Sequence, residues 1–194
     1  MTGGTAMSEH RFTEGNLIIL YAIHRGGSMN GIVPDYIRER IRLGLDTLGI
    51  VMSSKPDRYN TKIILVAGEE NAGPIKELLQ KGGVDEKMIV LDSRSKNVAQ
   101  TLDQILNMIK PRPNPPHIYF VGSVWLRDIY ESIVTSKFRG YKVQFEGALD
   151  HRPVKDVEQD RALEPPKRNS EYYKRKTKDK VIDMLLNYIF REKK

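Results

Sequence analysis

Five short apolar runs, each followed by a cluster of polar or glycine residues, dominate the pattern of this 194-residue sequence. The runs are nearly continuous, which is typical of strands buried on both faces in a parallel sheet covered by helices. They occupy residues 17–23, 63–67, 88–91, 118–121 and 143–145. The polar clusters follow at residues 24–27, 68–71, 92–95, 122–123 and 150–152. Because open α/β sheets bind ligands outside the carboxyl ends of their strands, we expect a site at these clusters.

Helical periodicity separates the apolar runs. Ile37, Ile41, Leu45 and Leu48 recur at helical spacing after Pro34, a residue favoured in a first helical turn. The pattern predicts a three-layer α/β sandwich around a mainly parallel, Rossmann-like sheet of about five strands, with an extra C-terminal helix. We expect a flexible N-terminal extension over 1–15, an α/β domain over 16–153, and a charged linker with a basic amphipathic helix over 154–194.

Composition narrows the class of protein further. With no cysteine, the chain has no disulfide framework and no cysteine nucleophile or metal ligand. This is compatible with a reducing compartment, and we expect a cytoplasmic protein. No apolar stretch approaches the ~20 residues of a transmembrane helix, so we expect no membrane span.

The net charge of +7 is concentrated near the C-terminus. Residues 167–194 contain ten Lys or Arg and four Asp or Glu, which gives +6. A basic end of this kind can bind nucleic acid or acidic lipid. We prefer a solvated helix face, because no aromatic and glycine RNA-binding motif accompanies the charge. The apolar stripe expected on the same helix, over residues 170–191, would dock on the α/β body or on a second copy in a homodimer.

Glycines and hydroxyls mark the ends of two apolar runs. Gly68 and Gly122 would let a ligand approach the backbone, and the helix that follows each would offer free N–H groups to an anion. A tight strand-to-helix turn explains either glycine alone. Together with Ser95 and Ser123 at matching positions, they favour a groove of the size of a phosphate or carboxylate.

Acidic and histidine side chains offer further chemistry at the strand ends. Glu69 and Glu70 could bind Mg²⁺ with Asp92 or supply a general base, although paired loop acids are more often solvated. His24 and His151 also follow strands, but a zinc site needs three or four converging ligands, and we predict no metal. The sequence contains neither a Walker loop nor a G-x-G-x-x-G fingerprint, and Ser123 lacks the G-x-S-x-G elbow.

Several of these residues form an ordered series of short motifs along the chain. An arginine on the first helix is followed by a small-Gly turn after the second strand, an acid-x-x-Ser-x-Asn segment after the third, and a Val-Gly-Ser turn after the fourth. The matching residues are Arg40, Ala67-Gly68-Glu69, Asp92 with Ser95 and Asn97, Val121-Gly122-Ser123, and Arg127. In this order the chain resembles the ElyC/SanA/YdcF family of α/β proteins over roughly residues 16–148. It departs from the family at Glu69, which replaces a glycine, at Val98, which replaces a threonine, and in lacking the histidine of the fourth motif.

The resemblance and the strand-end pattern together predict binding, and as a further step turnover, of a small anionic ligand such as a nucleotide or an S-adenosylmethionine-like molecule. In this hypothesis Gly68, Gly122 and Ser123 contact the ligand, and Arg40 and Arg127 neutralise its charge. Asp92 and Ser95 orient a sugar or an amine. Asn97 belongs to the same motif, and Glu69 is the candidate acid or base.

Two other hypotheses remain open. The first is a nucleic-acid or protein interaction module that uses Lys174-Arg175-Lys176 and neighbouring basic residues. The second is a catalytically inactive relative retained for assembly, which the missing histidine suggests.

Overall fold

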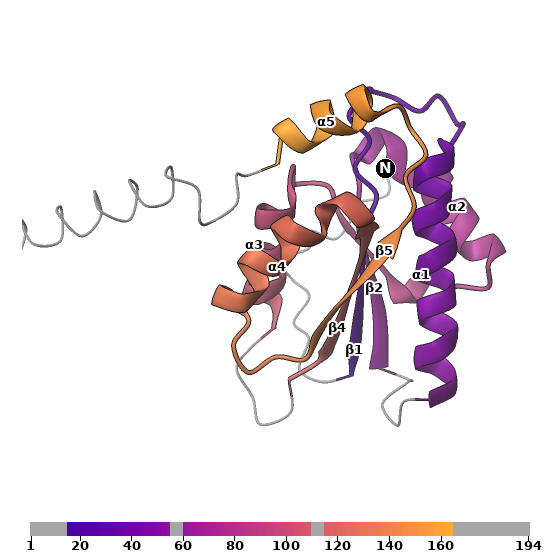
Figure 1. Cartoon of the computed structure of the whole chain (residues 1–194). Helices are drawn as coiled ribbons and strands as arrows, with labels where there is room; N and C mark the ends of the chain where they lie inside the picture. Colours follow the sequence, from indigo (N-terminus) through magenta and orange to yellow (C-terminus); the bar gives the residue numbers. More distant parts are fainter. Residues whose placement is uncertain (1–14, 55–59, 110–114, 165–194) are drawn as a thin grey trace, which may run out of the picture.

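Five parallel strands form one sheet in the order β3-β2-β1-β4-β5. The computed structural model describes residues 15–54, 60–109 and 115–164 (Figure 1). The strands are β1 (Asn16–Tyr21), β2 (Thr61–Val66), β3 (Ile89–Asp92), β4 (His117–Ser123) and β5 (Val143–Ala148). This sheet confirms the parallel, Rossmann-like architecture predicted from the apolar runs.

Helices connect successive strands and cover both faces of the sheet (Figure 1). They are α1 (Asp35–Ser54), α2 (Glu69–Lys81), α3 (Val98–Met108) and α4 (Arg127–Lys137), with short 3₁₀ turns η3 (Glu86–Met88) and η4 (Val124–Leu126). A further helix, α5 (Val154–Ala162), follows β5. Among the described residues, no helix has both the length and the hydropathy required to cross a bilayer.

Alternation along the central strand divides the core into two layers. Ile18 and Leu20 of β1 pack with the α1 and α2 side, where Ile37 is fully buried. Leu17 and Ile19 point the other way and pack with α3 and α4. Burial of each such side chain contributes about 1.5–3 kcal/mol, so the sheet is held from both faces.

Strand register brings the predicted site residues to the carboxyl edge of the sheet, that is, to the end at which all five parallel strands finish. Tyr21 is paired with Val66, and Val66 with Asp92, while Gly122 lies one position beyond the partner of Leu20. Gly68 follows two residues after the end of β2. The prediction that Gly68, Asp92 and Gly122 lie near one edge is therefore confirmed. The strand order reverses between β1 and β4, and such switch points are the usual ligand positions of open α/β sheets.

The charged stretch after residue 153 contains the helix α5, whereas its composition predicted a linker. Its sequence lacks a continuous apolar stripe, so periodicity gives little signal for a helix there. Figure 1 shows α5 across the end of the sheet to which the strands point. The amphipathic helix predicted over residues 170–191 lies outside the described residues.

Candidate functional site

A network of charged and aromatic side chains fills the edge of the sheet at the β1/β4 switch point. Its members come from the β1–α1 loop, α1, β4, the β5–α5 loop, α5 and the residues that follow α5. We call them the switch-point network: Arg25, Tyr36, Arg40, Ser123, Asp150, Arg152, Asp160 and Glu164. The network therefore joins segments that are distant in the sequence.

Arg40 lies at the centre of this network and is only 1% exposed. Its Nε and Nη2 donate to Ser123 Oγ at 3.0 and 2.7 Å, and its Nη1 donates to the Tyr21 carbonyl at 3.0 Å. Nη2 also lies 3.8 Å from Asp150 Oδ2. Burial lowers the pKa of Arg40, while Tyr36 and Asp150 act in the opposite direction. The guanidinium thus ties α1 to β1 and β4, and its predicted contact with an anionic ligand stays a prediction.

Asp150 is the main acceptor of the network. Arg152 donates to both of its oxygens from Nε and Nη2 at 2.9 Å, in the bidentate geometry typical of arginine and carboxylate. Trp125 Nε1 and Ser123 Oγ donate to its Oδ2 at 3.0 and 3.1 Å. Burial alone would raise the pKa of Asp150, but the hydrogen bonds from Arg152 and Trp125 hold that pKa well below its usual range. Asp150 is therefore ionised at neutral pH.

Arg152 connects the β5–α5 loop to both α1 and α5. Its Nη1 donates to Asp160 Oδ2 at 2.7 Å. Its guanidinium carbon lies 3.7 Å from the centroid of the Tyr36 ring, a favourable cation–π distance. Burial alone would lower its pKa, yet the hydrogen bonds to Asp150 and Asp160 raise the pKa of Arg152.

Glu164 places a carboxylate at the start of α3. Its Oε1 accepts hydrogen bonds from the Tyr21 hydroxyl and from Arg25 Nη2, both at 2.5 Å. Its Oε2 accepts from the Val98 backbone N–H at 2.8 Å. The Glu164 side chain is fully buried, and the positive end of the α3 dipole favours its charge. Burial and the adjacent Glu164 raise the pKa of Tyr21, so the hydroxyl remains a donor.

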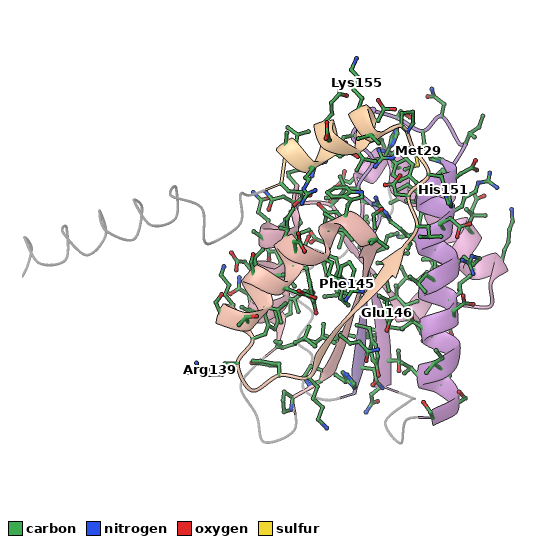
Figure 2. The ribbon with its side chains drawn as sticks, in the orientation of Figure 1. Met29, Arg139, Phe145, Glu146, His151 and Lys155 are labelled. Atoms are coloured by element: carbon green, nitrogen blue, oxygen red, sulfur yellow. The ribbon has the colours of Figure 1, made fainter. Side chains whose placement is uncertain are left out.

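His24 contacts this network through Tyr36. Its Nδ1 lies 2.6 Å from the Tyr36 hydroxyl. Burial lowers the pKa of His24, although Asp160 opposes that shift. The imidazole is therefore mainly neutral at pH 7. His151, the other strand-end histidine, lies at the same end of the molecule and is exposed (Figure 2).

The loop between β1 and α1 is fixed against α2. The backbone N–H of Met29 donates to Asn71 Oδ1 at 2.7 Å, and Asn71 Nδ2 donates to the Gly27 carbonyl at 2.9 Å. Met29 lies close to the carboxyl edge of the sheet, whereas Arg139 lies at the opposite end (Figure 2). Asn71 thus holds the loop that carries His24 and Arg25.

The predicted residues near β2 and β3 form a second group, beside the start of α3. Asp92 Oδ1 accepts from the backbone N–H groups of Arg94 and Ser95, both at 3.1 Å. Asp92 Oδ2 and Ser95 Oγ are buried and have no hydrogen-bond partner among the described residues. Asn97 caps α3 by accepting from Gln100 N–H at 2.9 Å. This segment leads directly to Val98, which holds Glu164.

Glu69 and Gly68 lie at the edge of this second group. Glu69 is exposed at the start of α2 and accepts a hydrogen bond from Ser93 Oγ at 3.1 Å. A Cβ at Gly68 would meet the Glu70 carboxylate, a flexible group that can move away. The predicted acid or base role of Glu69 stays a prediction.

Gly122 precedes Ser123 of the switch-point network but faces the core, and Arg127 begins α4 outside that network. A Cβ at Gly122 would approach the Phe120 ring to 3.0 Å and Leu126 to 3.1 Å, so core packing accounts for this glycine. Arg127 begins α4, is half exposed and lies 3.6 Å from Glu131. Its guanidinium carbon is 4.9 Å from the centroid of the Phe145 ring. Their predicted ligand contacts stay predictions.

Several members of the network were not singled out as candidates in the sequence. Arg25, Asp150 and Arg152 lie in the clusters that follow β1 and β5, so their position was a usable signal. Tyr36, Asp160 and Glu164 have no local signal, because tertiary contacts alone bring them to the site. Within the parts of the chain that the structure describes, no group of three or more His, Asp or Glu residues has the arrangement of a metal site.

Comparison of the chain with protein-family models, with curated proteins and with solved structures gave no significant match.

Proposed function

We propose that this protein binds a small anionic ligand, such as a nucleotide or an S-adenosylmethionine-like molecule, at the carboxyl edge of the sheet beside the β1/β4 switch point. The main support is the pair Arg25 and Arg152, whose side chains are each 18% exposed. Their partners Asp160 and Glu164 come from α5 and the residues that follow it. Without Asp160 and Glu164, both arginines and the N-terminus of α3 would lie at the carboxyl edge of the sheet, and this region would carry a net positive charge.

The chemistry of the neighbouring groups favours a ligand that carries hydroxyl or amine groups in addition to its anionic group. Arginine suits carboxylate and phosphate groups, which it binds through two parallel hydrogen bonds. Asp92 Oδ2 and Ser95 Oγ have no partner within the described part of the chain, and they suit a hydroxyl or an amine because unpaired buried polar atoms are costly. These are the groups that a nucleoside or an amino-acid-like ligand supplies beside its anion.

Turnover is the second part of the proposal. His24 is neutral and already shares a short contact with the Tyr36 hydroxyl, so it is a candidate to accept a proton from a bound ligand. Glu69 is the alternative base, on the β2 side of the edge. His24→Gln and Glu69→Gln separate these roles. Only the substitution that removes the catalytic base should lower turnover while leaving ligand affinity unchanged.

A thermal-shift panel tests the binding proposal. The compounds are AMP, ADP, glucose 6-phosphate and S-adenosylmethionine. A compound present at about 100 times its dissociation constant stabilises a protein by ~2.7 kcal/mol. At ~2–4 °C per kcal/mol, we expect a rise in melting temperature of about 5–11 °C. The proposal fails if none of the compounds, at millimolar concentration, raises the melting temperature.

The resemblance to the ElyC/SanA/YdcF family supports the same proposal through the order of its short motifs, and membership of that family is itself a proposal. The rival function, nucleic-acid binding by the basic end, is favoured by the charge of +6 over residues 167–194. A chain that ends at Glu164 separates the two functions. It should keep small-ligand binding and lose any affinity for nucleic acid.

A further inference from the structure

We infer that Glu164 occupies the position of the ligand's own anionic group, and that binding of a carboxylate or phosphate there displaces α5 from the sheet edge. This inference rests on the proposed function and adds to it a mode of regulation. The ligand would exchange with an internal carboxylate instead of entering a vacant site.

The first argument is the origin of the groups that hold Glu164. The hydroxyl of Tyr21 comes from β1, the guanidinium of Arg25 from the next loop and the N–H of Val98 from α3. All three belong to the α/β body. Tyr21 and Arg25 donate to one carboxylate oxygen of Glu164, and the Val98 N–H donates to the other. A carboxylate or phosphate of a ligand has the oxygens to accept the same three hydrogen bonds.

The second argument is the weak apolar attachment of α5. The helix has nine residues, and helices of fewer than ~12–15 residues are marginal in isolation. Val154 is 72% exposed and Leu163 is 58% exposed, and within α5 only Asp160 is buried. The contacts with the network are made by the carboxylate of Asp160 on α5 and by that of Glu164, two residues after the helix ends. An incoming anion at the Glu164 position would therefore replace one of the two carboxylates that hold α5, and leave Asp160 with Arg152 as the other.

The third argument is the state of the adjoining loop. Asp92 Oδ2 and Ser95 Oγ, on the segment that leads into Val98, are buried without a hydrogen-bond partner among the residues that the structure describes. Unpaired buried polar atoms are uncommon in native structures, and a water, an ion or a ligand commonly satisfies them. A ligand anchored at Val98 and Arg25 would pass close to this segment and could supply that partner.

Hydrogen exchange on the full-length protein tests the displacement directly. The probes are inorganic phosphate and, separately, acetate, which distinguish the two sources of negative charge. We expect whichever of the two anions binds to increase amide exchange across residues 154–164 and to leave amide exchange in β1 and β4 unchanged. Binding of phosphate or acetate without increased exchange in residues 154–164 would overturn the inference.

A matched pair of variants provides the second test. Glu164→Gln removes the internal charge just after α5, whereas Glu158→Gln changes an exposed glutamate within α5. We expect Glu164→Gln to bind phosphate roughly tenfold more tightly than wild type, within the usual range of coupling between two competing states. Glu158→Gln should bind as wild type does.

The outcomes separate the inference from the proposed function. If a compound of the thermal-shift panel binds wild type, Glu164→Gln and Glu158→Gln equally, the inference fails and the proposed function stands. If neither wild type nor Glu164→Gln binds phosphate, acetate or any panel compound, both fail. If Glu164→Gln does not fold, the exchange experiment on wild type still decides the inference.

Discussion

Replacing Arg40 with alanine should destabilise the protein substantially. The change removes the hydrogen bonds to Ser123 and to the Tyr21 carbonyl and leaves that carbonyl without its charged donor. Removing one partner of a buried ion pair costs about 3–5 kcal/mol. Asp150 keeps its bidentate bond with Arg152, so we expect about 3–4 kcal/mol, the lower part of that range.

Differential scanning calorimetry measures this effect. At ~2–4 °C per kcal/mol, the melting temperature of Arg40→Ala should fall by about 6–16 °C. Arg42→Ala is the matched control, because Arg42 lies on the same helix with an exposed side chain and pairs with Glu39 and Asp46. Arg42→Ala should leave the melting temperature close to that of wild type, because exposed ion pairs contribute little to stability. Equal melting temperatures for the two variants would refute the view that Arg40 holds the strand ends together.

Three further changes test other parts of the structure. The lowered pKa of His24 means that the unfolded chain takes up a proton first, so stability should fall as pH drops below about 6.5, and His24→Gln should flatten that decline in urea unfolding curves. The lowered pKa of Asp150 gives stability that is present above about pH 4 and lost in more acidic solution, so Asp150→Asn should be less stable at pH 7 and less sensitive to acid. Gly122→Ala should cost about 1–3 kcal/mol by crowding Phe120 and Leu126, and an unchanged melting temperature would show that the neighbouring side chains yield without cost.

The sequence was informative about the sheet because burial on both faces leaves a continuous apolar run. Ile18 and Ile19 of β1 point to opposite helical layers, and both are fully buried. The polar residues that follow each run therefore predict the carboxyl edge. The edge position of Gly68, Asp92 and Gly122 follows from this pattern alone.

The contacts within the site could not be read from the same pattern. Tyr21 and Glu164 are 143 residues apart, and only tertiary packing brings them together. The helix α5 is too polar to produce a periodic signal, and its position depends on Asp160 and Glu164. The motif order marks Arg40 as a candidate, but the sequence does not show that Tyr21, Ser123 and Asp150 enclose its guanidinium.

Calorimetric titration of the most stabilising panel compound tests the central claim most directly. The proteins are wild type, Arg25→Ala and Arg42→Ala, of which only the first substitution changes the switch-point network. A charged hydrogen bond contributes about 1.5–3 kcal/mol, so Arg25→Ala should weaken binding by roughly 10- to 150-fold, and Arg42→Ala should bind as wild type does. Unchanged affinity in Arg25→Ala would contradict an anion-binding site beside the β1/β4 switch point.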